Sequence, residues 1–153
     1  MARLDDIPEP TRTAVRDLPC PRFDTTPFVT GTPLARHRVA LISSAALVRH
    51  GEAPFAVGSG EARAIPGRPG AHALLMSHVS INFDRSGFQR DLNVVFPIDR
   101  LHDLADEGLI GSVADTHYAV MGSTEPAEMA GSVQAMADGL QADRVTAAVL
   151  LPV

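Results

Sequence analysis

The chain of 153 residues lacks lysine altogether and contains one cysteine, Cys20. Without lysine, no Schiff-base nucleophile can come from this sequence. A single cysteine excludes an intrachain disulfide framework and a zinc site built from several cysteines, and it indicates a reducing, cytoplasmic setting. Cys20 lies between two prolines, where it is either a small buried hydrophobe or a thiol directed at a site.

Long apolar runs and clusters of positive charge are missing as well. No stretch approaches the length of apolar residues that a membrane-spanning helix needs, and the first ten residues show no signal peptide. The net charge is -5 and aromatic residues make up 5% of the chain, so the basic stripe and stacking side chains of a nucleic-acid-binding protein are absent. We therefore expect neither a membrane nor a nucleic acid as a partner.

The N-terminal part of the chain is rich in proline. Residues 1–33 contain six prolines, which interrupt regular backbone hydrogen bonding too often for a long helix or strand. This segment is predicted to be an extended arm, with one short helix from Thr11 to Asp17. An arm of this kind wraps its own domain or a neighbouring subunit, so a homo-oligomer is expected. Residues 34–153 are predicted to form a single domain.

Apolar runs and turn residues predict the remaining elements. Strands are expected at residues 38–44, 62–65, 72–77, 109–114 and 145–153, and helices at residues 99–108 and from residue 126 onward. Strands alternating with helices predict an α/β fold, with a mostly parallel sheet of four or five strands and helices on both faces, as in a Rossmann-like three-layer sandwich.

Burial is also predicted for these elements. The run at residues 38–44 is almost continuously apolar and should be the central strand, and the run at 145–153 should be a buried strand. The helix after residue 126 has an apolar stripe at helical spacing, which is expected to face the core: Met129, Val133, Met136 and Leu140.

The stretch from Ser77 to Leu101 follows neither a helical nor a strand period. It mixes charged and amide side chains with phenylalanines, and a disordered linker would lack such bulky apolar residues. It is therefore predicted to be an ordered functional loop. The alternative is a long connection held by internal salt bridges.

Two histidines are the candidate acid and base. His78 and His117 are each expected to follow a strand directly, which would place them near one edge of a parallel sheet, where ligands bind. Imidazole titrates near neutral pH, and Asp84 or Asp91 could orient one of the rings. The alternative for both is a structural histidine with satisfied hydrogen bonds.

Neighbouring polar residues are candidates for holding a substrate. Asp84 and Arg85 could bind its charged groups, although adjacent opposite charges more often pair with each other. Asn93 and Tyr118 could donate to a developing anion or could simply close the loop. Further candidate contacts are Ser77 and Asn82.

A metal site from His78, Asp84 and His117 is chemically allowed but matches no specific zinc spacing, so no metal is expected.

The sequence SHVSINFDRSGFQRDLNVVFPIDRLHDLADEGLIGSVADTHYAVMGSTEP resembles the selenoprotein B subunits of the glycine, sarcosine, betaine and D-proline reductases. The similarity is densest from Met76 to Pro126. The similarity extends more weakly through LPCPRFDTTPF, RVALISSAAL and the final VLLPV. Within the family, the chain resembles the short, stand-alone branch.

The resemblance implies a reductive cleavage of a small amine or amino-acid-like substrate, with a thiol reductant. A selenolate or thiolate would attack the carbon that bears the amine, because the anion is the nucleophile. In the complete reductases a partner subunit carries a pyruvoyl group that activates the amine. The family's redox motif begins with selenocysteine or cysteine and would follow Val153; no cofactor is expected within the visible chain, and Cys20 is its candidate redox residue.

Because the sequence stops at Val153, two interpretations stay open. In the first, a selenocysteine codon has been read as a stop. In the second, this member lacks the motif and is a redox-free lyase, isomerase or cyclase that uses histidine and aspartate as acid and base. A catalytically silent binding subunit is a third possibility.

Overall fold

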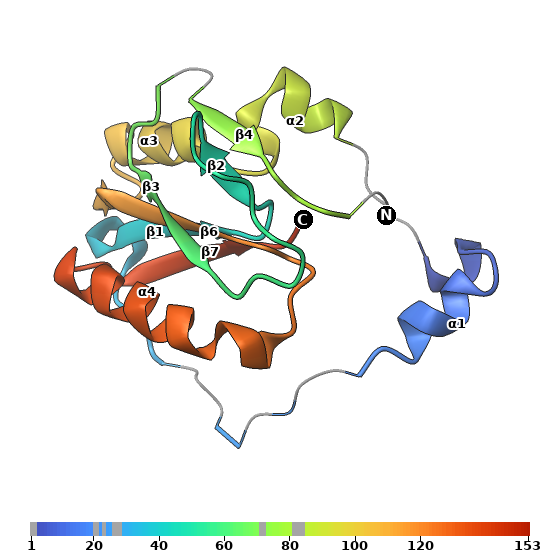
Figure 1. The fold of residues 1–153 in the computed structure, drawn as a ribbon. Coiled ribbons are helices and arrows are strands. Elements are labelled where there is room, and N and C mark those ends of the chain that lie inside the picture. The colour runs from blue at the N-terminus through green and yellow to red at the C-terminus, as the bar shows by residue number, and fades with distance from the viewer. Residues whose placement is uncertain (1–2, 20–21, 23, 26–28, 71–72, 81–84) are drawn as a thin grey trace.

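The computed structural model describes residues 3–19, 22, 24–25, 29–70, 73–80 and 85–153 (Figure 1). Strands and helices alternate along it, with short 3₁₀ helices (η) between them. In chain order the elements are η1 (Leu4–Asp6), α1 (Thr11–Arg16), η2 (Leu34–Arg36), β1 (Arg38–Ser43), β2 (Leu47–Arg49), β3 (Ala62–Pro66), β4 (Leu74–Met76), α2 (Ser86–Arg90), η3 (Leu92–Val94), α3 (Ile98–Asp106), β5 (Ser112–Val113), β6 (Thr116–Val120), η4 (Pro126–Met129), α4 (Ala130–Ala142) and β7 (Ala147–Leu151).

The sheet is built around β1, as its apolar sequence predicts. β7 pairs in parallel with β1 from Val39 to Ser43 and so occupies one whole side of it. The other side is shared by two parallel partners, β5 at the start of β1 and β6 at its end. β1 is therefore the central strand, and its neighbours come from the last third of the chain.

The sheet is mixed rather than mostly parallel. β3 pairs with β6 in the antiparallel sense and forms an edge. The segment predicted as a strand at residues 72–77 is the short β4, which pairs with β2 in a separate antiparallel pair and stays outside the main sheet. The α/β class is confirmed, whereas the Rossmann-like three-layer sandwich is not, because the sheet is mixed and curled.

The helices α3 and α4 lie on opposite faces of the sheet (Figure 1). Val39 and Leu41 of β1 point to one face, where they pack in the core cluster with Ile98 and Leu101 of α3. Tyr118 of β6 points to the other face and lies under α4, with its hydroxyl next to Gly139. The strand pair β2–β4 packs beside α3, because Leu47 and Leu74 belong to the same core cluster.

Burial at the C-terminal part of the chain differs from the prediction. β7 lies at an edge of the sheet, and Val149 and Leu150 are 41% and 70% exposed. The apolar stripe of α4 is not core either, since Val133 is 44% exposed and no residue of α4 is buried. The apolar runs predict the positions of this strand and this helix correctly. They do not predict how much of each element is buried by the rest of the protein.

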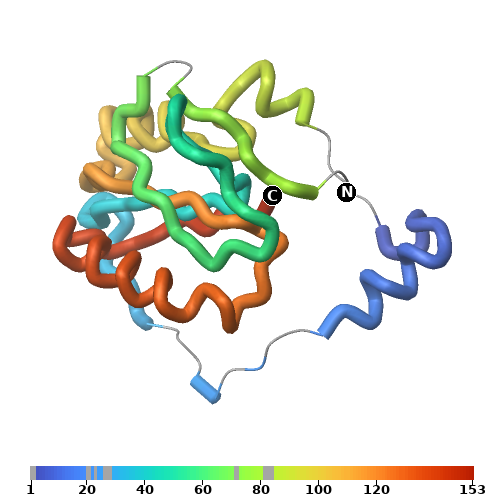
Figure 2. Tube along the Cα trace, in the orientation of Figure 1, coloured from blue at the N-terminus to red at the C-terminus, as the bar shows by residue number. Residues whose placement is uncertain are grey.

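The proline-rich arm contains the short helix expected from its sequence, as α1. No residue of η1 or α1 is buried, and Figure 2 shows this part of the chain standing off from the body of the sheet and its helices. No helix in the described part of the chain is both long and apolar enough to span a membrane.

Candidate functional site

The parallel strands end together around Ser44, the residue after β1. The Ser44 backbone N–H donates to the carbonyl of Leu151 at the end of β7, and its hydroxyl accepts from the N–H of Val153. On the other side the N–H of Gly122, just after β6, donates to the Ser44 carbonyl. This junction is the carboxyl edge of the sheet, where α/β proteins commonly bind ligands.

Gly122 is required at this junction by close approach of the backbone. A Cβ atom at Gly122 would lie 2.9 Å from the Ser44 carbonyl oxygen and 3.0 Å from the Ser44 hydroxyl oxygen. Any side chain there would push the ends of β1 and β6 apart. Neither residue was predicted as functional from the sequence, where Ser44 is the last residue of the strand expected at 38–44 and Gly122 belongs to a polar turn.

His78 directly follows a strand, but this strand is β4, which pairs in the antiparallel sense outside the main sheet, so the prediction that a parallel strand carries His78 to the edge is wrong. The preceding residue, Ser77, donates its N–H to the carbonyl of Ala46, and its hydroxyl accepts from the N–H of Phe55. These bonds fix the chain that leaves β4 against the turn that follows β1. His78 itself is 6% exposed.

Arg85 and Ser80 hold His78 in one conformation. The Arg85 guanidinium donates to the carbonyls of His78 and Ser80 at 2.7 and 2.6 Å, and the Ser80 N–H donates to His78 Nδ1 at 3.1 Å. Because Nδ1 accepts, the neutral ring carries its proton on Nε2. Burial, and secondly the charge of Arg85, lower the pKa of His78, so the ring is neutral at neutral pH.

His117 does not follow a strand, which corrects the prediction. It lies inside β6, fully buried, and its Nδ1 accepts from the N–H of Leu41 in β1 at 2.8 Å. The Phe96 ring packs against the imidazole in an edge-to-face arrangement, with centroids 5.6 Å apart. Burial lowers the pKa of His117 to about 4. His117 thus uses Nδ1 within the sheet, whereas its buried Nε2 has no hydrogen-bond partner among the described residues, so the ring is not fully satisfied.

Tyr118 also lies inside β6 rather than in a loop. It is 9% exposed, and burial raises the pKa of its phenol. Its hydroxyl is directed under α4 toward Gly139. Tyr118 and His117 follow each other on the strand, so they point to opposite faces of the sheet.

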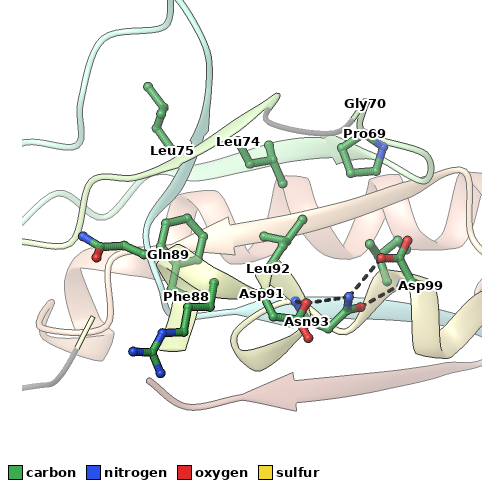
Figure 3. Close-up of a pocket in the computed structure, with 12 residues that line it drawn as sticks. Pro69, Gly70, Leu74, Leu75, Phe88, Gln89, Asp91, Leu92, Asn93 and Asp99 are labelled. Atoms are coloured by element: carbon green, nitrogen blue, oxygen red, sulfur yellow. Dashed lines mark hydrogen bonds between the residues drawn. The ribbon is translucent and has the colours of Figure 1, made fainter. Parts of the chain in front are cut away.

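The remaining part of the polar stretch lines a hollow of about 440 Å³ (Figure 3). One wall is formed by Leu74 and Leu75 of β4 and another by Phe88 and Leu92. Asp91, Asn93 and Asp99 form its polar end. The first two of these were predicted to be site residues, whereas Asp99 was predicted only as the start of the helix at residues 99–108.

Asn93 connects the two aspartates at this end. Its side-chain amide donates to Asp91 Oδ1 and to Asp99 Oδ2, both at 2.9 Å, and its Oδ1 accepts from the N–H of Asp99 at the start of α3. Hydrogen bonds from the Asn93 backbone and side chain lower the pKa of Asp91. Asn93 therefore closes the loop with these bonds, and the structure does not bring Asp91 into contact with either candidate histidine in the part of the chain described.

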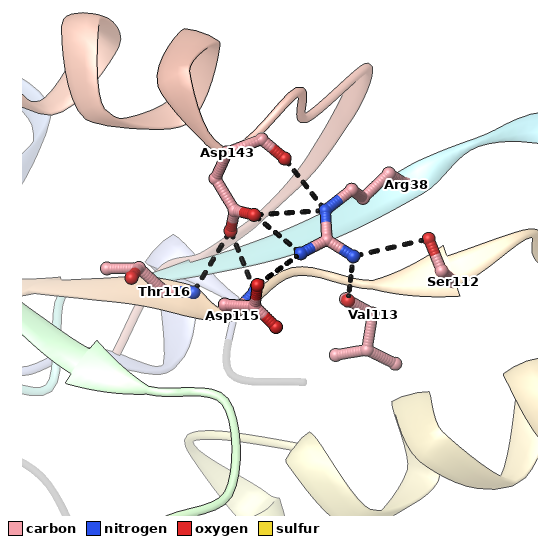
Figure 4. A network of polar contacts seen from close by, with 6 residues as sticks. All are labelled: Arg38, Ser112, Val113, Asp115, Thr116 and Asp143. Carbon is pink, nitrogen blue, oxygen red and sulfur yellow. Dashed lines mark hydrogen bonds and ion pairs between the residues drawn. The ribbon is translucent and has the colours of Figure 1, made fainter.

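A second polar cluster lies at the opposite, amino edge of the sheet (Figure 4). Arg38 at the start of β1 donates to the carboxylate and carbonyl of Asp143, which follows α4, and to the carbonyl of Val113. The other Asp143 oxygen accepts from the N–H groups of Asp115, just before β6, and of Thr116, the first residue of β6. This Arg38–Asp143 clasp joins four elements, and its residues were not predicted from the sequence.

Cys20, Asn82 and Asp84 lie outside the described residues, so the structure does not address their predicted roles. Among the residues that are described, no group of three or more histidine, cysteine, aspartate or glutamate side chains is arranged to hold a metal ion.

Comparison with known proteins gives two matches. The family model "Glycine/sarcosine/betaine reductase selenoprotein B" matches residues 12–152. The D-proline reductase subunit gamma of Acetoanaerobium sticklandii is 30% identical over 102 residues, which are 63% of this chain and 41% of that protein. The chain thus spans about two fifths of the length of this curated relative. No solved structure matches.

Proposed function

Because the chain belongs to the glycine/sarcosine/betaine reductase selenoprotein B family, we propose that it takes part in the reductive cleavage of a small amine or amino-acid-like substrate. The observation that carries this proposal is the junction at Ser44, where three parallel strands end and where Ser77, the residue before His78, donates to the carbonyl of Ala46. Ligands bind at such edges in α/β proteins, and a buried imidazole with a lowered pKa marks a candidate functional position.

The proposed reaction begins when a selenolate or thiolate attacks the carbon that bears the amine. The carbon–nitrogen bond breaks, its electron pair leaves with nitrogen, and the nitrogen takes up a proton from water. A thiol then attacks the chalcogen, a bond forms between the two, and the released carbon takes up a proton. A dithiol reductant returns the chalcogen to its reduced form.

His78 fits this reaction as a hydrogen-bond donor. Its Nε2 carries the proton of the neutral ring, because Nδ1 accepts from Ser80. The lowered pKa makes full proton transfer from an imidazolium less favourable at neutral pH. His78 would therefore stabilise negative charge that develops on a substrate group, as a fixed donor does in an oxyanion hole.

The test is reductant-dependent turnover by the protein from its native source. It is incubated with D-proline, glycine, sarcosine or betaine and a dithiol, and deaminated product is measured by NMR. We expect product only with the dithiol, and a loss of about 10²-fold in kcat for His78→Leu, which has no side-chain donor. His50→Leu, at an exposed histidine after β2, is the matched control and should keep full activity.

Three outcomes decide the proposal. Product formed equally well without the dithiol supports a redox-free lyase instead. No product from any of the four substrates, in protein shown to be folded by circular dichroism, contradicts the proposal. The Cys20→Ser variant, if inactive, assigns the nucleophile to Cys20, and if fully active, assigns it to a group outside residues 1–153.

A further inference from the structure

The hollow between β4, α2 and the start of α3 is separate from the strand junction at Ser44. Figure 3 shows its leucines and Phe88 along the walls and the hydrogen-bonded residues Asp91, Asn93 and Asp99 gathered at one end. Its volume of about 440 Å³ lies in the range of small-molecule sites. The reaction proposed above does not use this hollow.

The walls of the hollow present solvent-accessible apolar surface. Leu74 and Ile98 are buried at 7% and 3% exposure and so form a rigid base, whereas Leu75 is 46% exposed at the mouth. Phe88 and Leu92 are half-buried and pack against the core. An apolar group seated here would remove this surface from water without requiring the base to rearrange.

Its polar end is arranged for a positive charge. The Asn93 amide uses both of its N–H groups on Asp91 and Asp99, so it holds the two carboxylates at one place. In the part of the chain described, the second oxygen of each carboxylate accepts no hydrogen bond. Both side-chain N–H groups of Asn93 are therefore already used. A ligand at this end meets only acceptor oxygens and negative charge, from the two carboxylates.

The neighbouring cations compensate this charge only in part. Hydrogen bonds from Asn93 and, to a smaller extent, the charge of Arg100 lower the pKa of Asp91, but the ion pair of Arg100 is with Asp103, one turn along α3, at 3.0 Å. Arg90 borders the hollow but forms no ion pair with Asp91 or Asp99 among the described residues. A cationic ligand would thus find two acceptor oxygens that no side chain described here occupies.

We propose that this hollow binds a small organic cation, with its ammonium group between Asp91 and Asp99 and its apolar group against Leu74 and Phe88. Apolar burial supplies affinity, and the ammonium–carboxylate hydrogen bonds supply discrimination against neutral and anionic molecules. The inference does not depend on the reductive reaction, because it concerns binding alone.

The test is a titration of the ¹⁵N-labelled full chain with benzylammonium, followed by NMR. Benzyl alcohol, of nearly the same shape but neutral, is the ligand control. We expect shifts confined to residues 74–75, 88–93 and 98–99, with a dissociation constant on the order of millimolar and binding of the alcohol about tenfold weaker or more.

The variant for this test is the double substitution Asp91→Asn and Asp99→Asn. Asparagine keeps an oxygen that can accept from Asn93, so the loop bonds survive while the charge is removed. Binding of benzylammonium should weaken at least about tenfold. The matched control is Asp106→Asn, which removes an exposed charge from the end of the same helix, outside the hollow, and should bind normally.

The proposal is overturned if benzyl alcohol binds as tightly as benzylammonium, or if the shifts map elsewhere on the protein. It is equally overturned if the double variant, with an otherwise unchanged spectrum, binds as well as the parent chain, or if no shift occurs up to about 50 mM ligand.

Discussion

His117 is the residue whose environment has the clearest energetic consequence. The imidazole is fully buried between β1 and Phe96, and its Nδ1 must stay unprotonated to accept from the Leu41 N–H. In the unfolded chain the ring has an ordinary pKa of 6.5, whereas burial lowers it to about 4 in the folded protein. Between these values the unfolded chain binds more protons than the folded protein does.

We therefore predict that the folded protein loses stability as the pH falls from 6.5 to 4. The depressed pKa means that this contribution is fully present above 6.5 and is lost as protons bind the unfolded chain, and it amounts to at most about 3 kcal/mol. Urea unfolding of the parent chain and of His117→Asn at several pH values measures it. Asparagine offers an acceptor oxygen near the Nδ1 position but does not titrate.

The expected result is a weaker pH dependence of the unfolding free energy in His117→Asn than in the parent chain over this range. Equal pH dependence in the two proteins would contradict the prediction. A constant difference in stability would not, because the smaller side chain leaves a cavity at every pH.

The sequence identified His78 and His117 as residues of interest but could not separate their roles. Both follow an apolar segment, and the polar pair Asp115–Thr116 before His117 indicated a loop. In the structure Asp143 accepts the backbone N–H groups of this pair, so the strand resumes at Thr116 and takes His117 into the core. Such a contact, 28 residues along the chain from Asp115, leaves no local signal.

At the scale of elements, α4 approaches β6 closely at one glycine. A Cβ atom at Gly139 would lie 2.1 Å from the Tyr118 hydroxyl oxygen, while one at Gly131, in the first turn of the same helix, meets nothing within 4 Å. Gly139 therefore permits the close packing of α4 on the sheet, and Gly131 has no such role.

We predict that Gly139→Ala destabilises the protein by about 1–3 kcal/mol, through overpacking against Tyr118. Gly131→Ala should leave stability equal or raise it by up to about 1 kcal/mol, because alanine is the better helix former. Thermal unfolding of both variants checks this. Adding Tyr118→Phe to Gly139→Ala should restore part of the loss, and a Gly139→Ala protein as stable as Gly131→Ala would refute the packing argument.

Elements with complete local signals were predicted well. The helix expected at residues 99–108 is α3, and Gly108 takes the left-handed conformation, with φ of 72°, that the end of a helix favours. β1 is central because its apolar run can be buried on both faces. β7 has a similar apolar run yet lies at an edge of the sheet. The composition of a strand shows that it can be buried, but not which other strands will pair with it.

At the scale of the whole molecule, the Arg38–Asp143 clasp holds the amino edge of the sheet together. Burial by itself raises the pKa of Asp143, but hydrogen bonds from Arg38 and from the N–H groups of Thr116 and Asp115 lower it overall. The Asp143 side chain is 13% exposed, whereas Asp115, which also pairs with Arg38, is 89% exposed.

We predict that Asp143→Asn costs about 1–3 kcal/mol of unfolding free energy at neutral pH, because it weakens a partly buried charge pair. Asp115→Asn should cost under about 0.5 kcal/mol, as exposed pairs usually do. Urea unfolding of the two variants gives both values. The idea of a clasp fails if the two substitutions cost the same.

The position of β1 between residues 112–120 and 147–151 has a consequence for synthesis on the ribosome. The central strand is made before all three of its partners, β5, β6 and β7, and Asp143, the partner of Arg38, follows it 105 residues later. Contacts of such sequence separation slow folding, because a long chain must close before they form. A nascent chain therefore carries β1 as an uncovered apolar strand for most of its translation, and in that interval a chaperone is expected to bind it.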